Sequence, residues 1–116
     1  MYKCLYLNMV SAALAAVAIS FSASAAETTI LQHEKSFRSS NDQPLTEYKI
    51  KVGDVIEFRN EDPFFHNVFS LSDIKSFDLG SYPKGQSRKV TFDKPGTVDV
   101  ECAIHANMQL RIEVTK

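Results

Sequence analysis

The sequence predicts an all-β protein organised as a β-sandwich of about seven short strands. Apolar and polar residues alternate with a period of two along most of the chain after residue 27, as expected of strands with one buried face. Turn residues separate the alternating segments, among them Gly53 and the neighbours Pro95 and Gly96. Short strands punctuated in this way are typical of a sandwich.

The predicted strands follow one another over residues 29–37, 46–52, 55–60, 66–72, 87–92, 97–102 and 109–114. In each of them the apolar set of the alternation is expected to point into the core. Residues 72–86 are less regular, and we interpret them as a long connection with a short helical turn near Asp73 to Ser76. The side chains predicted to face inward are Tyr48, Ile50, Val52, Ile56, Phe58, Val90, Phe92, Val98, Val100, Cys102, Leu110, Ile112 and Val114.

The first 26 residues have the pattern of a secretory signal peptide. An early Lys3 precedes an apolar run over about residues 9–21, and Ala23 and Ala25 stand in an A-x-A relation. The apolar run is short for a membrane span, which needs about 20 apolar residues. We therefore predict export to the periplasm and a mature domain over 27–116, with an uncleaved membrane anchor as the alternative. Cys4 is badly placed for a lipoprotein acceptor.

Composition narrows the function of the remaining domain of about 90 residues. Without Lys3 the chain has 12 basic and 14 acidic residues, a net charge of −2, and no basic patch suggests nucleic-acid binding. If Cys4 leaves with the signal, Cys102 has no disulfide partner. A free thiol in an oxidising compartment is a liability unless it is buried or occupied, for example by a metal.

Four residues form a candidate metal site. Cys102, His105 and Met108 stand three positions apart at the end of one predicted strand and in the loop after it. His66 begins a different strand, and strand ends of a sandwich gather at one pole. Two imidazoles, a thiolate and a weak axial thioether are the donors of a type 1 copper site. We expect one copper ion, cycling between Cu(I) and Cu(II).

Other interpretations of these residues compete with copper. Zinc is the main competitor, although structural zinc sites use more cysteines and methionine is not among their usual ligands. An iron–sulfur cluster needs several thiolates. Cys102 and Met108 are also compatible with ordinary core positions, and His105 with an exposed loop residue. The remaining histidine, His33, stands beside Glu34 and is interpreted as a surface residue.

The segment CAIHANM, residues 102–108, resembles the ligand loop of small type 1 copper proteins of the cupredoxin superfamily, most of all the short loop of the amicyanins. Residues 51–70 and 92–102 resemble the plastocyanin-family segments that carry the first histidine and the cysteine. The resemblance spans about residues 28–116. Relatives often have an aromatic residue where this chain has Val100 and a proline where it has Ala106, which leaves ligation intact but bears on loop rigidity and potential.

The resemblance implies a Greek-key sandwich of seven to eight strands and a monomeric one-electron carrier between larger redox proteins. It implies that Asn67 ties the two ligand segments together and that electrons pass the outer edge of His105. We expect no catalysis, because no open coordination position and no carboxylate near the metal are evident. A copper carrier or chaperone and a metal-free interaction module are the alternatives. The expected docking patch around His105 comprises Phe64, Phe65, Ala103, Ile104, Ala106 and Asn107, with Pro63 beside it; packing of the loops themselves is the alternative.

Overall fold

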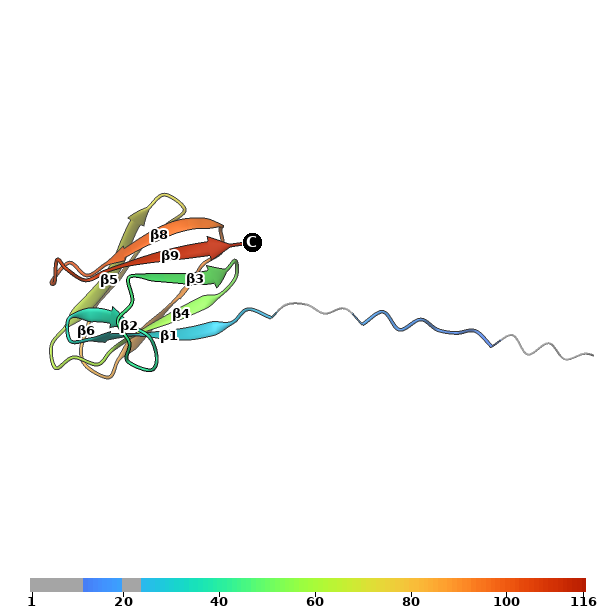
Figure 1. Cartoon of the computed structure of the whole chain (residues 1–116), viewed down its shortest axis with the longest axis horizontal. Coiled ribbons are helices and arrows are strands. Elements are labelled where there is room, and N and C mark those ends of the chain that lie inside the picture. Colours follow the sequence, from blue (N-terminus) through green and yellow to red (C-terminus); the bar gives the residue numbers. More distant parts are fainter. Residues whose placement is uncertain (1–11, 20–23) are drawn as a thin grey trace, which may run out of the picture.

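The computed structural model describes residues 12–19 and 24–116, and its strands form two facing sheets (Figure 1). The first sheet has the order β2-β1-β4-β7. The second has the order β3-β9-β8-β5-β6. This arrangement confirms the predicted all-β sandwich. The strands are β1 (Glu27–His33), β2 (Ser36–Arg38), β3 (Glu47–Lys51), β4 (Val55–Asn60), β5 (His66–Ser72), β6 (Lys75–Tyr82), β7 (Ser87–Thr91), β8 (Gly96–Glu101) and β9 (Gln109–Thr115).

Most strand pairs are antiparallel, and two pairs are parallel. β1 runs parallel to β4, with Glu27 opposite Val55, and β3 runs parallel to β9, with Glu47 opposite Arg111. Each parallel pair joins segments that are distant in sequence, so the order of the strands differs from their order along the chain. The pairing of β5 with β8 matters most for function, because Phe69 lies opposite Glu101 and brings the segments before and after these strands to one end of the sandwich.

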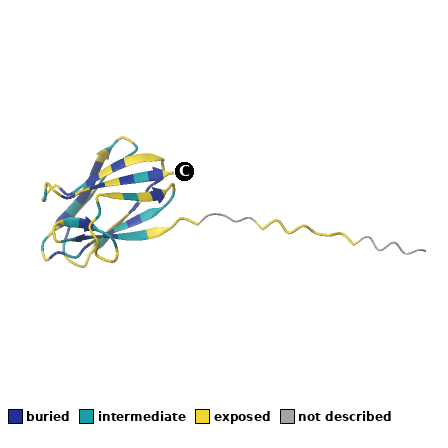
Figure 2. Cartoon of the chain, viewed as in Figure 1, coloured by how far each residue is buried: buried dark blue, intermediate teal, exposed yellow. Residues whose placement is uncertain are grey.

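The core follows the predicted alternation (Figure 2). Full burial of an aliphatic or aromatic side chain contributes about 1.5–3 kcal/mol, so the inward faces of these strands supply most of the driving force for folding. Tyr48 is only half-buried, and Val52 is wrongly predicted: it is 40% exposed because β3 ends at Lys51 and the chain turns through Gly53 at φ 94°. The core includes Ile30, Ile50, Ile56, Phe58, Val68, Tyr82, Val90, Phe92, Val98, Val100, Leu110, Ile112 and Val114.

The prediction for residues 72–86 is wrong in part. These residues contain β6, which pairs with β5 as a hairpin, and the helical turn expected near Asp73 to Ser76 is a tight turn between strands. β6 is an edge strand, and its apolar residues Phe77 and Leu79 are only partly buried against the core. Because few side chains of β6 are buried, its alternation of apolar and polar residues is a weak indication of a strand in the sequence.

The first predicted strand is two strands. β1 and β2 form a hairpin whose turn residues, Glu34 and Lys35, both have positive φ, at 52° and 56°. A two-residue hairpin turn of this type needs positive φ at both of its central residues, and glycine or asparagine usually occupies these positions. Because this turn contains neither, the sequence did not indicate it. This split and β6 together explain why nine strands are described where seven to eight were expected.

Of the described residues before β1, Ala26 is hydrogen-bonded to the sandwich through Asp54 and Val55. Residues 12–19 and 24–26 have no regular secondary structure and are exposed. Within the described ranges no helix is long and apolar enough to cross a membrane. The predicted signal peptide over residues 1–26 falls largely on residues 1–11 and 20–23, with Cys4 among them, which lie outside the described part of the chain.

Candidate metal centre

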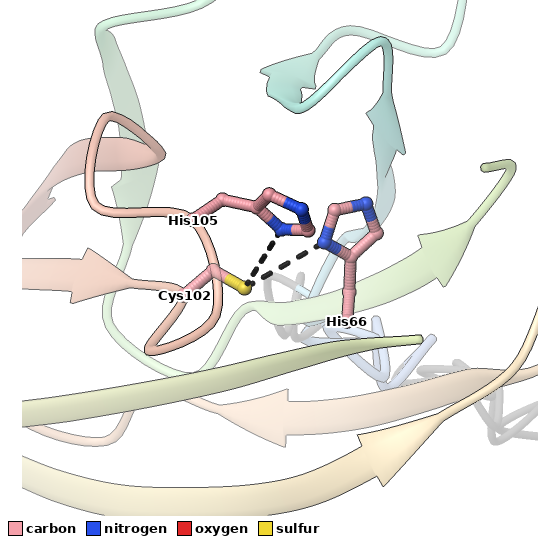
Figure 3. A group of neighbouring side chains, drawn as sticks. All are labelled: His66, Cys102 and His105. Atoms are coloured by element: carbon pink, nitrogen blue, oxygen red, sulfur yellow. Dashed lines mark hydrogen bonds between the residues drawn. The ribbon is translucent and has the colours of Figure 1, made fainter. Parts of the chain in front are cut away.

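One pole of the sandwich gathers three of the predicted ligands (Figure 3). His66 is the first residue of β5, and Cys102 directly follows β8. His105 belongs to the loop that connects β8 to β9. The strand alternation fixes the direction of the first two side chains, because His66 and Cys102 both lie on the buried face, with 0% and 3% of their surface exposed. Cys102 carries a free thiol.

The donor atoms of these residues converge. The Cys102 Sγ lies 3.6 Å from His66 Nδ1 and 3.9 Å from His105 Nδ1. All three donor atoms lie within 4.8 Å of one another. Both imidazoles therefore turn Nδ1 toward the sulfur and Nε2 away from it, as Figure 3 shows for the two rings.

These separations fit one bound metal ion. Metal–imidazole and metal–thiolate bonds in zinc sites are about 2.0 and 2.3 Å, and a shared ion with these bond lengths and angles of about 109–120° would place sulfur and nitrogen about 3.5–3.7 Å apart. The observed sulfur–nitrogen distances of 3.6 and 3.9 Å are close to that requirement. The donor set of one thiolate and two imidazoles, with a methionine in the same loop, is the one that selects copper in its type 1 geometry.

Met108 is buried at the end of the same loop. Its exposed fraction is 1%, and its side chain belongs to the hydrophobic core. The Met108 backbone N–H donates to the His105 carbonyl at 2.9 Å, and the Cys102 N–H donates to the Met108 carbonyl at 3.2 Å. These bonds curl residues 102–108 back on themselves. The loop therefore places Met108 on the inner side of the site, where an axial thioether is expected.

Asn67 connects the two ligand segments, as the resemblance implies. Its side-chain Oδ1 accepts a hydrogen bond of 2.7 Å from the Ala103 backbone N–H. Asn67 follows His66 in β5, and Ala103 follows Cys102 in the loop. One hydrogen bond thus fixes the relative position of two ligands that are 36 residues apart.

The structure contradicts the expectation that no carboxylate lies near the site. Asp62 is buried, and its Oδ2 lies 2.6 Å from His66 Nε2, on the side of the ring opposite to the cysteine. Burial alone raises the pKa of Asp62, but hydrogen bonds from His66 and from the backbone N–H groups of Lys35 and Glu34 outweigh it and hold the pKa below its usual value of 3.8. The carboxylate is therefore ionised at neutral pH and accepts from His66.

His105 differs from His66 in its surroundings. It is half-buried, and its Nε2 edge points away from the cysteine. Partial burial lowers the pKa of His105, and its neighbours His66 and Lys35 lower it further, against a smaller opposing effect of the Asp62 charge. A lowered pKa keeps the imidazole neutral at pH 7, with its Nδ1 lone pair available to a metal.

Aromatic and small residues surround the ligands. The Phe64 ring contacts both imidazoles, with ring centroids 5.2 Å from His66 and 5.2 Å from His105. The Lys35 ammonium lies over the Phe64 ring, 5.7 Å from its centroid. Phe65 and Ile104 are 54% and 53% exposed. Exposed positions nearby along the chain are Pro63, Ala103, Ala106 and Asn107.

His33 lies outside the donor cluster. Its Nδ1 is hydrogen-bonded to Asp42 Oδ1 at 3.0 Å, and this bond, with the charges of Asp42, Glu34 and Asp62, raises the pKa of His33 above its usual value despite an opposing effect of burial. His33 is half-buried at the end of β1. This ion pair at the sheet end agrees with the interpretation of His33 as a residue without a ligand role.

Comparison with solved structures identifies the architecture. No protein-family model and no curated protein sequence matches the chain. A copper-containing nitrite reductase from Thermus scotoductus is similar over 78% of this chain and 22% of its own, with a TM-score of 0.67 and 26% identity. A variant of amicyanin in its Cu(I) form is similar over 81% of this chain and 86% of its own, with a TM-score of 0.65 and 23% identity. A reduced variant of amicyanin gives a TM-score of 0.62 at 23% identity, over 80% and 84% of the two chains.

These similarities and the topology define a cupredoxin fold that resembles amicyanin. The pole of this fold carries the donor atoms of His66, Cys102 and His105, and with the buried Met108 of the same loop they make up the ligand set of a type 1 copper site for one ion. This chain spans 22% of the nitrite reductase, so the reductase as a whole gives no direct guide to its activity.

Proposed function

We propose that this protein is an exported, periplasmic one-electron carrier that holds one type 1 copper ion and exchanges electrons with larger redox proteins. The observation that carries the proposal is the convergence of the Cys102 sulfur and two imidazole nitrogens within 4.8 Å at a pole where one of the two imidazoles, that of His105, is only half-buried. His66, Cys102, His105 and Met108 would hold the ion. When bound, copper supplies reversible one-electron chemistry between Cu(I) and Cu(II).

The protein's own part is to keep the ligands in place in both redox states. His66 and Cys102 are anchored at the ends of β5 and β8, and the hydrogen bond from Ala103 to Asn67 holds those ends together. The buried core beneath Met108 prevents the loop from moving inward. A site held in one geometry needs little rearrangement when the charge on the metal changes, and small rearrangement favours fast electron exchange.

The rim of the pole suits a transient partner. Phe65 and Ile104 are exposed apolar residues near His105, and the neighbouring loop residues Ala103, Ala106 and Asn107 carry no charge. Transient redox complexes bury small interfaces, below about 1,200 Å² in total, so an apolar rim of this kind is sufficient. A partner seated there would lie next to the half-buried His105.

Copper delivery is the second candidate function. It would require ligands that a recipient protein can reach and exchange. Burial of His66 and Cys102, with 0% and 3% of their surface exposed, favours retention of the metal instead. We therefore propose electron transfer rather than delivery, and a non-catalytic role rather than an enzyme.

Copper loading tests the proposal. The domain over 27–116, reconstituted with one equivalent of Cu(II), is expected to develop an intense visible charge-transfer band and a reversible one-electron voltammogram without loss of metal. Loading with Zn(II) serves as the matched competitor. A colourless copper complex would overturn the type 1 assignment. A blue protein that yields its copper to a chelator during redox cycling would favour delivery.

A further inference from the structure

Asp62 stands out among the buried polar residues because it accepts three hydrogen bonds within one small cluster. Its Oδ2 accepts from His66 Nε2 at 2.6 Å and from the Lys35 backbone N–H at 3.0 Å. Its Oδ1 accepts from the Glu34 backbone N–H at 2.7 Å. With 3% of its surface exposed, this carboxylate has little access to water. One of these bonds is directed at a predicted copper ligand, and the other two hold the carboxylate to the turn between β1 and β2.

We propose that Asp62 is the positioning residue for His66, which fixes both the tautomer and the orientation of this ligand. The inference depends on the proposed copper site. An ionised carboxylate has no proton to donate, so the imidazole must carry its proton on Nε2. The Nδ1 atom, 3.6 Å from the Cys102 sulfur, is then left with a free lone pair. A carboxylate in this position also makes the imidazole a more basic ligand.

Two further elements hold the carboxylate in place. The turn of the β1–β2 hairpin presents the N–H groups of Glu34 and Lys35 to it, and both turn residues have positive φ. On the other side, the Asp62 backbone N–H donates to Asn60 Oδ1 at 2.8 Å. Asn60 Nδ2 in turn donates to the Phe64 carbonyl at 2.8 Å, which fixes the loop that leads to His66. Asp62 therefore cannot rotate away from the ring without breaking several bonds.

The charge of Asp62 gives it a second effect. A buried negative charge beside a ligand stabilises the more positive metal state, because the low local dielectric screens it weakly. Cu(II) would gain more than Cu(I), and the reduction potential would be lower than in a site without the carboxylate. The opposite charge in the neighbourhood, the Lys35 ammonium, is directed to the Phe64 ring rather than to a ligand.

The test uses Asp62→Asn, which keeps the shape of the side chain. An amide cannot reproduce all three bonds: its oxygen in the Oδ2 position still accepts from His66 and Lys35 but leaves the NH₂ against the Glu34 N–H, and the reverse orientation places the NH₂ against both His66 Nε2 and the Lys35 N–H. In the metal-free protein at pH 8, ¹⁵N NMR should report the Nε2–H tautomer of His66 alone in the wild type, whereas the variant, in which either end of the amide can face the ring, should no longer hold a single tautomer. Asp42→Asn is the control, since it removes the same charge from an exposed carboxylate that bonds His33.

The copper-loaded proteins supply the second measurement. Loss of a carboxylate behind a metal-bound histidine typically lowers affinity by about 10- to 100-fold. If Cu(II) affinity falls tenfold more than Cu(I) affinity, the potential rises by about 59 mV for one electron. Asp42→Asn should leave tautomer and potential close to those of the wild type.

Each result decides the proposal. An Nδ1–H tautomer in the metal-free wild type would overturn it, and this measurement needs no folded variant and no copper. An unchanged potential in a folded Asp62→Asn protein would also overturn it. Rescue of the wild-type potential by Asp62→Glu would support it. If copper gives no blue colour, the proposed function fails, while the tautomer of His66 still tests the role of Asp62.

Discussion

Replacing Asn67 with alanine should loosen the connection between the two ligand segments. The change removes Oδ1, which accepts the 2.7 Å hydrogen bond from the Ala103 backbone N–H. A hydrogen bond of this kind contributes about 0.5–1.5 kcal/mol net. Ala103 is exposed, so water can satisfy its N–H after the substitution, and the loss should fall in the lower half of that range.

Thermal unfolding of the metal-free domain measures this loss. For a domain of 60–100 residues, 1 kcal/mol corresponds to a shift of about 4–8 °C in Tm, so we expect Asn67→Ala to lower Tm by roughly 2–8 °C. In the copper-loaded protein the substitution should also broaden the visible band, because His66 and Cys102 are no longer held together. Gln109→Ala is the control, since it breaks an exposed 3.3 Å bond to Glu101 between side chains. If Asn67→Ala unfolds at the same temperature as the control and keeps the wild-type spectrum, the tie between the segments has no energetic role.

Three further outcomes are expected. Met108→Gln should retain copper and have a lower reduction potential, because the axial ligand tunes potential more than affinity, and complete loss of copper binding would show instead that Met108 is a strong ligand or a core residue. Ala106→Glu, which places a charge on the exposed rim, should slow electron self-exchange at matched ionic strength without moving the visible spectrum, whereas equal rates would mean that electrons leave by another face. An NMR titration of His33 should give a pKa above 6.5 that falls toward 6.5 in Asp42→Asn. Because the pKa is raised in the folded state, the stabilisation from this pair is present below pH 6.5 and disappears as the pH rises through the raised pKa. A pKa of His33 that Asp42→Asn leaves unchanged would argue against the ion pair.

Local patterns in the sequence were sufficient for most of the sandwich. Strands β4, β8 and β9 alternate clearly, and Val98, Val100 and Ile112 are fully buried as their alternation predicts. The loop ligands were found because Cys102 and His105 lie within one short motif. The shared donor cluster with His66 needed one further inference, that strand ends meet at a pole, and the structure brings the three residues together.

Features that depend on distant contacts were missed. The β1–β2 turn uses Glu34 and Lys35 at positive φ, where no glycine marks the reversal. β6 is an edge strand with partly buried side chains, and its pairing with β5 follows from the tertiary fold. Asp62 accepts hydrogen bonds from backbone N–H groups 27 and 28 residues earlier in the chain, and these distant contacts cannot be predicted from the residues around it. The one available signal was its position four residues before His66.

The copper-dependent visible spectrum, recorded for the wild type and for Cys102→Ser, tests the copper site most directly. The Cys102 sulfur lies 3.6 and 3.9 Å from the two imidazole Nδ1 atoms, and a thiolate in this position would supply a sulfur-to-copper charge-transfer band. The wild type should turn blue with one equivalent of Cu(II), and Cys102→Ser should stay colourless while its far-UV circular dichroism still shows a folded β-sandwich. A blue Cys102→Ser protein, or a folded wild type that stays colourless with copper, would contradict a type 1 site at this pole.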